Sequence, residues 1–171
     1  LAGYTSVYGQ DETPNPTPEK VKENIRKAEQ GYAKAQYNLG NMYRRGEGVP
    51  QDYILAYKWY KLAAEEGYAE AQYNLGTMYD LGSEGVVPKD DQLAIKWYKL
   101  AAEQGHARAQ AALGGMYALG QGVPKDYVLA YKWFNLAAAQ GHKNASNNRD
   151  VLDKRMNTSQ IQEAQRLARE F

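Results

Sequence analysis

Apolar residues recur along the chain with the spacing of an α-helix, in segments that come in pairs. The first segment of a pair places them at i, i+4, i+7 and i+8, as at Ala35, Leu39, Met42 and Tyr43. The second places them at i, i+3, i+4, i+7 and i+8, as at Ala56, Trp59, Tyr60, Ala63 and Ala64. Each pattern puts an apolar stripe on one face of a helix, so the sequence predicts amphipathic helices that pack through these faces.

This pair of segments occurs three times along the chain. Matching glycines stand at Gly31, Gly67, Gly105 and Gly141, which are 36, 38 and 36 residues apart. The two additional residues of the second unit fall in a Gly-rich loop, where an insertion costs little. The units therefore span 31–66, 67–104 and 105–140, and each is expected to fold as helix, Gly-rich loop, helix and Gly turn.

Residues at matching positions of the units are expected to share structural roles. The predicted N-caps of the second helices are Asp52, Asp90 and Asp126. One glycine interrupts each first helix, at a cost of about 1 kcal/mol in helix propensity; these glycines are Gly40, Gly76 and Gly114. Their shared register predicts a close backbone approach of a neighbouring helix. The tryptophans are predicted to be core residues: Trp59, Trp97 and Trp133.

The two ends of the chain depart from the repeat. Residues 1–16 show little periodicity and are predicted to be a flexible lead-in or the remnant of a signal peptide. The remaining residues, 17–171, form the repeat domain. It begins with a capping helix over 18–30, in which Pro18 takes the first helical position. Residues 141–171 start like another unit, but Arg149 and Asp150 replace its Leu-Gly pair, which predicts a degenerate closing helix pair.

Composition removes several classes of function. The chain carries 21 Lys and Arg against 20 Asp and Glu, and its net charge of +1 argues against the basic footprint of a nucleic-acid-binding protein. It contains no cysteine, which excludes disulfides, thiol nucleophiles and zinc knuckles. No apolar run approaches the roughly 18 residues of a membrane span, so no membrane insertion is expected. Large aliphatic residues are few, and the core must combine aromatic side chains with alanine.

The repeated pattern resembles a known family. Residues 31–140 contain three copies of one pattern, and this pattern closely resembles the SEL-one-like repeat of bacterial proteins. It reads Ala-x-x-x-Leu-Gly-x-x-Tyr-x-x-Gly-x-Gly-Val-x-x-Asp-x-x-x-Ala-x-x-Trp-Tyr-x-x-Ala-Ala-x-x-Gly. The resemblance implies an all-α, right-handed solenoid of antiparallel helix pairs and an adaptor or scaffold role in protein complexes. One secreted branch of the family carries a disulfide in each repeat, and this chain lacks those cysteines. A ligand-binding or hydrolase-like envelope protein of that branch is the alternative.

SEL-one-like repeats are a subclass of the tetratricopeptide-type solenoids, so the resemblance also implies that the first helix of each unit lines a concave groove. The side chains expected to face a protein or peptide partner there are Lys34, Tyr37, Asn38, Asn41, Arg44, Arg45, Glu70, Tyr73, Asn74, Thr77, Asp80 and Arg108. The third unit continues this row with Ala111, Ala112 and Gly115. The groove should therefore change from long polar and aromatic side chains to small ones.

Part of this row resembles the carboxylate clamp of some tetratricopeptide domains. The matching donors are Lys34, Asn38, Asn74 and Arg108, while Ala112 replaces a second basic residue. They would suit a free peptide C-terminus. The alternative is that the asparagines satisfy backbone groups and the cations are ordinary surface charges. Tyr37 and Tyr73 either anchor a partner or pack against each other between units.

No pattern indicates catalysis, a cofactor or a metal site. The two histidines, His106 and His142, occupy the position that Tyr32 and Tyr68 hold in other units, which favours a packing role. No His, Asp or Glu cluster has the spacing of metal ligands. The sequence therefore predicts a non-enzymatic interaction module that can also self-associate through the solenoid ends. Its compartment is left open, with a periplasmic or secreted location favoured over a cytoplasmic one.

Overall fold

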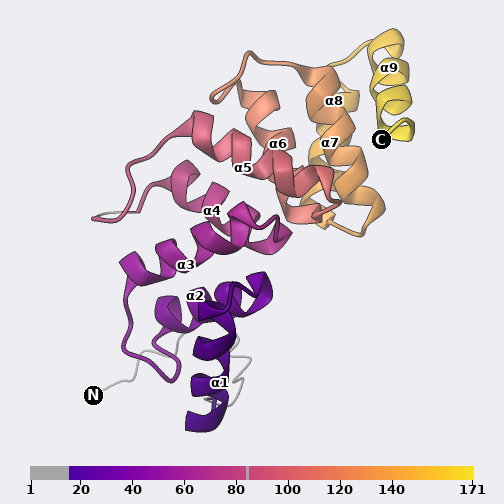
Figure 1. Cartoon of the computed structure of the whole chain (residues 1–171). Coiled ribbons are helices and arrows are strands. Elements are labelled where there is room, and N and C mark those ends of the chain that lie inside the picture. Colours follow the sequence, from indigo (N-terminus) through magenta and orange to yellow (C-terminus); the bar gives the residue numbers. More distant parts are fainter. Residues whose placement is uncertain (1–15, 84) are drawn as a thin grey trace, which may run out of the picture.

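The structure, a computed structural model, describes residues 16–83 and 85–171, and these residues form nine α-helices (Figure 1). Their bounds are α1 Pro18–Glu29, α2 Ala33–Arg45, α3 Tyr53–Glu65, α4 Ala69–Leu81, α5 Asp91–Glu103, α6 Ala107–Leu119, α7 Tyr127–Ala139, α8 Lys143–Asp153 and α9 Thr158–Arg169. The predicted lead-in, apart from Pro16, lies outside the described residues. The predicted helix pairs are confirmed, with α2, α4 and α6 as first helices and α3, α5 and α7 as second helices.

Local sequence signals fix where the second helices begin. The Oδ1 atoms of Asp52, Asp90 and Asp126 accept hydrogen bonds from the backbone N–H groups of Leu55, Leu93 and Leu129, at 2.9, 3.0 and 2.9 Å. Each bond satisfies an amide that the first turn of a helix leaves without a partner. The three predicted N-caps are therefore confirmed.

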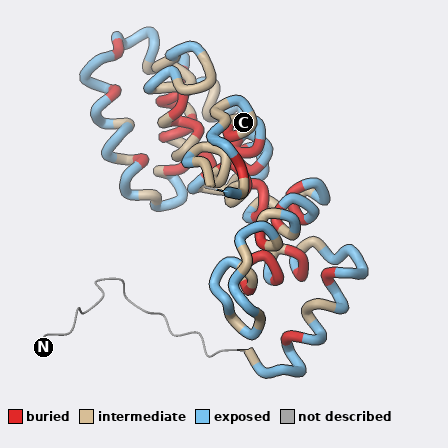
Figure 2. The backbone as a smooth tube through the Cα atoms, turned by 90° about the vertical axis from the view of Figure 1, so that its left-hand side faces the viewer, coloured by how far each residue is buried: buried red, intermediate tan, exposed pale blue. Residues whose placement is uncertain are grey.

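The helices stack in chain order into an α-solenoid. Consecutive helices pack against one another from α1 to α8, so the array runs from the α1 end to the α8 and α9 end (Figure 1). Buried residues follow the inner faces of the helices along this path (Figure 2). The expected all-α solenoid is therefore confirmed. The longer loop of the second unit closes through an isolated bridge between Ser83 and Val87.

The glycines of the first helices lie directly under aromatic rings. A Cβ atom at Gly40 would stand 2.7 Å from Tyr60 Cδ1, and one at Gly76 would stand 2.7 Å from Tyr98 Cδ1. At Gly114 the ring is that of Phe134, at 2.8 Å. The close approach is confirmed, but it is made mainly by a side chain of the second helix, whereas a backbone approach was expected.

Alanines and aromatic residues build the core, as the composition requires. Ala101, Ala102, Ala109 and Leu113 are fully buried beside Tyr98 in the middle of the array. Trp97 and Trp133 are buried as predicted. Trp59 is only partly buried, because it packs at the edge of the N-terminal cluster formed around α1 and α2.

The last helices depart from the geometry of the full units. In a full unit the second helix packs against its own first helix, but α9 packs against α7. Ala164 is the fully buried residue of this contact, and Ile161 lies partly buried beside it. Among the residues that the structure describes, no helix combines the length and apolar character needed to cross a bilayer.

Candidate functional site

The surface made by the first helices, α2, α4 and α6, together with α8, carries most of the predicted partner-binding residues. We call it the first-helix face. A cavity of about 300 Å³ on this face collects side chains from three successive first helices, α2, α4 and α6 with its N-cap: Tyr37, Glu70, Tyr73, Asn74, His106, Ala107 and Arg108. We call it the polar recess. Five of these residues were predicted from the sequence, so the solenoid brings together groups that lie up to 71 positions apart.

The aromatic walls of the polar recess are locked by contacts between units. Tyr37 packs on Tyr68 at the start of the next first helix, with ring centroids 5.2 Å apart. Tyr73 stacks on His106 in the same way, at 4.9 Å and an interplanar angle of 25°. The interpretation that Tyr37 and Tyr73 pack on each other is therefore wrong, because each ring is occupied by the helix-start residue of the following unit. Rigid aromatic side chains of this kind suit a binding surface.

His106 belongs to the site, although the sequence favoured a packing role alone. Its Nδ1 atom accepts a hydrogen bond from the backbone N–H of Ala109 at 3.2 Å, which caps α6. This bond requires an unprotonated Nδ1. Burial lowers the pKa of His106, while the nearby charge of Glu70 opposes that shift. The shared Tyr/His position was the available signal, but only the fold shows that it opens into the recess.

Several predicted partner-binding residues are engaged with the fold. The Tyr60 hydroxyl donates to Asn41 Oδ1 at 2.9 Å and accepts from Arg44 Nε at 3.2 Å. In the next unit the Tyr98 hydroxyl lies 3.2 Å from both Thr77 Oγ1 and Asp80 Oδ2. These bonds hold the rings over Gly40 and Gly76, the glycines inside the first helices, which we call the inner glycines. The first role of the bonds is therefore structural.

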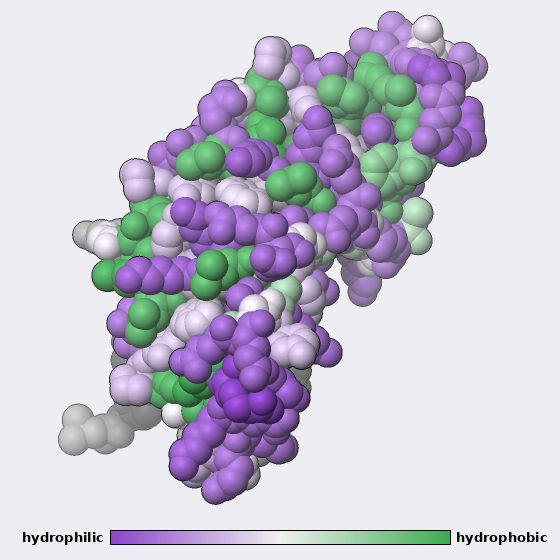
Figure 3. All heavy atoms as spheres, viewed as in Figure 1, coloured by the Kyte–Doolittle hydropathy of each residue, from purple (hydrophilic) through white to green (hydrophobic). Residues whose placement is uncertain are grey.

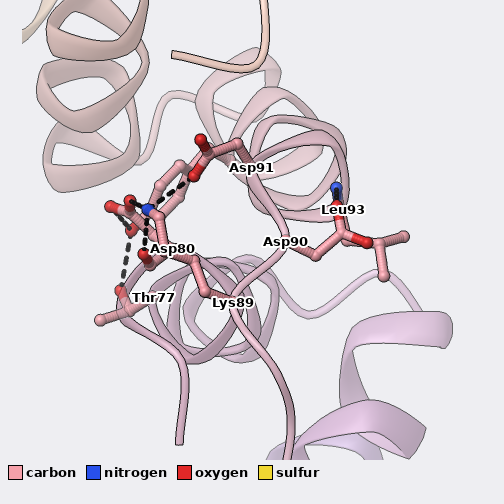
Figure 4. A network of polar contacts seen from close by, with 7 residues as sticks. Thr77, Asp80, Lys89, Asp90, Asp91 and Leu93 are labelled. Atoms are coloured by element: carbon pink, nitrogen blue, oxygen red, sulfur yellow. Dashed lines mark hydrogen bonds and ion pairs between the residues drawn. The ribbon is translucent and has the colours of Figure 1, made fainter.

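An ion-pair network continues from Asp80 (Figure 4). Lys89 Nζ donates to the backbone oxygen of Asp80 at 2.7 Å and pairs with Asp91 Oδ1 at 2.6 Å. The network joins the end of α4 to the start of α5. Burial raises the pKa of Tyr98, which supports a neutral phenol beside these carboxylates.

The remaining predicted residues lie nearer the N-terminal end. Asn38, Asn41 and Arg45 line a cavity of about 360 Å³ between α1 and α2, together with Lys20 and Asn24. Lys34 is exposed on α2. The four clamp-like residues are thus divided: Asn74 and Arg108 line the polar recess, whereas Asn38 lines the cavity beside α1.

A third cavity lies at the C-terminal end of the first-helix face. It has a volume of about 280 Å³, and its lining residues are Gly115, Ala118, Leu119, Tyr127, Phe134, Asn148, Val151, Leu152 and Arg155. We call it the apolar recess. The sequence predicted that the groove turns to small residues in the third unit, but of this lining it named Gly115 alone. Within residues 16–83 and 85–171, no group of His, Asp and Glu is arranged to hold a metal ion.

The helix pairs, their aromatic–glycine contacts and their order define an α-solenoid of tetratricopeptide type. Comparison with family models gives the family: Sel1 repeats match residues 33–68, 69–106 and 107–142. The chain therefore belongs to the Sel1 repeat family, whose repeats typically mediate protein–protein interactions. The matched repeats begin two residues after the glycines that open the units inferred from the sequence.

Solved structures agree with this assignment. A Sel1 repeat protein from Oxalobacter formigenes is 40% identical with a TM-score of 0.72, over 77% of this chain and 97% of that one. The protective antigen c5321 of uropathogenic Escherichia coli is 43% identical with a TM-score of 0.77, over 85% of this chain and 31% of that one. Helicobacter pylori cysteine-rich protein B, at 24% identity and a TM-score of 0.57 over 77% of this chain and 96% of that one, shares the fold. A search of curated proteins gave no match.

Proposed function

We propose that this protein is a non-enzymatic adaptor that binds a protein or peptide along the first-helix face, with the polar recess as its anchor. The supporting observation is the convergence of side chains from three repeats on that recess. A single repeat cannot form it, so recognition would depend on the folded array. Stacked repeats present a continuous surface that no single repeat has, and an extended partner can bind along it.

The chemistry of the polar recess suits a polypeptide. Glu70 and Arg108 supply opposite charges, and Asn74 supplies both a donor and an acceptor. Tyr37 and Tyr73 add broad apolar surface that their packing already holds in place. A peptide backbone with mixed side chains can use all of these groups. A free C-terminal carboxylate remains a proposed ligand for Asn74 and Arg108, since charge-assisted donors favour it.

The proposal is tested by capture of partners from the native cell lysate, followed by mass spectrometry. The test variant carries Glu70→Lys and Arg108→Glu, both at exposed positions, so that the charges exchange while the fold is kept. The matched control is Lys58→Glu, an exposed charge reversal on α3 outside the recess. A partner that wild type and control retain, and the double variant loses, supports the proposal. A partner that all three retain would place binding elsewhere.

The carboxylate is tested separately with any peptide that maps to the recess. Two forms of the peptide are compared, one with a free C-terminus and one amidated. Binding that is lost on amidation, and weakened by Arg108→Glu, supports a carboxylate ligand. Equal binding of both forms would remove the clamp from the proposal and leave the rest in place.

A further inference from the structure

The third unit differs from the first two at three positions that lie together around Gly114, its inner glycine. In the first two units a tyrosine covers the glycine, and its hydroxyl bonds to residues one and four positions after that glycine. In the third unit the ring is Phe134, and those two positions are Gly115 and Ala118. The hydroxyl and both of its partners are therefore missing together. Phe134, Gly115 and Ala118 carry no polar side-chain atom that would need a partner, and a hollow is left where the polar side chains would lie.

This hollow is the apolar recess, and large apolar side chains border it. Leu119 is 68% exposed and Val151 is 49% exposed, on α6 and α8 respectively. The aligned position on α4 also carries an exposed leucine, Leu81, but the cavity appears where Phe134 replaces tyrosine. Figure 3 shows hydrophobic side chains gathered near the C-terminal end of the molecule, whereas the α1 end is covered by hydrophilic ones. Exposed apolar side chains around a hollow indicate an interaction site.

The rim of the apolar recess is positively charged. Arg155 is the one cationic side chain of its lining, and the lining contains no carboxylate. Lys125 Nζ lies 5.6 Å from the ring centroid of Tyr127, which also lines the recess. Arg155 and Lys125 both lower the pKa of Tyr127, in keeping with a local positive potential. The chain as a whole has a net charge of only +1, so this potential is a property of the rim.

The size of the apolar recess favours a side chain over a free small molecule. Its volume of about 280 Å³ lies at or below the lower end of the roughly 300–1,000 Å³ typical of small-molecule sites. We propose that the apolar recess binds one large apolar side chain of a peptide segment from a partner protein, and that an acidic residue of that segment pairs with Arg155. The inference rests on the proposed function and deepens it by naming the class of segment recognised.

Geometry limits how far the acidic residue can lie from the apolar one. Arg155 lines the same recess that takes the apolar side chain, and an extended chain advances about 3.3 Å per residue. The two residues must therefore be adjacent or nearly so. A short segment that combines Leu, Ile, Phe or Met with a neighbouring Asp or Glu meets this requirement.

The inference is tested by a random-peptide display selection on the full chain. We expect Gly115→Leu to fill the recess and keep the fold, because a Cβ atom at Gly115 meets nothing within 4 Å and the residue is helical. Asn147→Leu is the matched control, since it adds the same side chain at an exposed position of α8 outside the recess. Arg155→Glu reverses the rim charge at an exposed position. Each variant is used once its melting temperature equals or exceeds that of wild type.

We expect peptides selected on wild type to share an apolar residue beside an acidic one. Gly115→Leu should weaken their binding about 10–100-fold, as expected when the burial of one large apolar side chain is lost. Asn147→Leu should leave binding unchanged. A new selection on Arg155→Glu should replace the acidic residue by a basic one.

Other outcomes would overturn the inference, and they separate it from the proposed function. One such outcome is that the peptides still bind Gly115→Leu and fail to bind the Glu70→Lys, Arg108→Glu variant. That result would support the proposed function and contradict the inference about the apolar recess. Failure to enrich any peptide would count against both. A chain mass that doubles with concentration, and returns to the monomer value in Gly115→Leu, would assign the recess to a second copy. If Arg155→Glu binds the selected peptides as tightly as wild type does, the inferred pairing of Arg155 with an acidic residue is wrong.

Discussion

Gln104 Nε2, at the end of the second repeat, donates a hydrogen bond to Gln72 Oε1 on the first helix of that repeat, at 2.8 Å. Gln72 Nε2 in turn donates to the backbone oxygen of Ala64 at 3.1 Å, in the preceding unit. Gln72 is buried, and so both ends of its amide are satisfied by protein groups. The same arrangement recurs one repeat later, where Gln140 donates to Gln110 at 2.8 Å. These glutamines join successive repeats by directional bonds in addition to apolar packing.

The first repeat lacks the outer donor of this arrangement. Gln36 Nε2 donates to the backbone oxygen of Ala28 at 3.3 Å, but its buried Oε1 has no hydrogen-bond partner among the described residues. The position of Gln104 and Gln140 is held there by Glu66. An ionised carboxylate only accepts hydrogen bonds, so it cannot satisfy the oxygen of Gln36.

We therefore expect Glu66→Gln to stabilise the protein. The new amide can donate to Gln36 Oε1, which should add about 0.5–1.5 kcal/mol to the free energy of unfolding. The melting temperature should rise by about 2–4 °C for each kcal/mol. Glu66→Ala is the control, since it removes the charge and supplies no donor. Equal melting temperatures for the two variants would show that the missing bond does not matter.

Two adjacent glycines of α6 should respond oppositely to alanine. A Cβ atom at Gly114 would meet Phe134 Cδ1 at 2.8 Å, whereas one at Gly115 meets nothing within 4 Å. Both substitutions gain about the same helix propensity, so the difference between them reports the clash alone. We expect Gly114→Ala to be less stable than Gly115→Ala by about 1–3 kcal/mol. Urea unfolding of the two variants measures this, and equal stabilities would contradict the ring contact.

Stability should fall in acid partly through His106. Because burial lowers its pKa in the folded chain, the unfolded chain binds the proton first as the pH drops below about 6.5. The contribution of the neutral ring is present above that pH and is lost below it. His106→Asn keeps a capping side chain that does not titrate. We expect the variant to lose less unfolding free energy than wild type between pH 7.5 and pH 5, and equal losses would argue against this role.

Alkaline pH should destabilise the fold through Tyr79. Burial and the 2.9 Å hydrogen bond with the Tyr57 hydroxyl raise the pKa of Tyr79 to about 12. An unfolded tyrosine releases its proton near pH 10, so the contribution is complete below that pH and is lost as pH rises toward 12. Unfolding free energies at pH 9 and pH 11 should therefore differ more for wild type than for Tyr79→Phe. A pH dependence that the substitution leaves unchanged would contradict the assignment.

The sequence predicted the fold well because the signals that specify it are local. The apolar spacing around Ala56 and Tyr60, the cap at Asp52 and the turn at Gly67 all act within one helix pair, and the repetition of the pair implies the stack. The inner glycines were recognised as contact points for the same reason. The identity of the group above Gly40, a tyrosine ring, depends on the angle between two helices, which the spacing does not give.

The site was predicted only in part because it depends on contacts between units. Tyr73 and His106 are 33 positions apart, and their stacking follows from the step between repeats. Within the first unit, the packing of α3 on α2 commits Arg44 to Tyr60, although its charge and register suggested a free partner-binding group. The replacement of tyrosine by Phe134 was visible in the sequence. The cavity beside Phe134 could not be predicted from the sequence, because it depends on where Gly115 and Ala118 lie in space.

The packing of α1 on a single neighbour gives it different dynamics from the interior of the solenoid. This helix packs against α2, whereas α7 is held by α6, α8 and α9. In a linear array a terminal element can detach while the others stay folded, because each contacts only its neighbours. Backbone amides of α1 should thus exchange with deuterium before those of α7. Unfolding would begin at the ends of the array, one of which lies beside the Gln36 oxygen that lacks its donor.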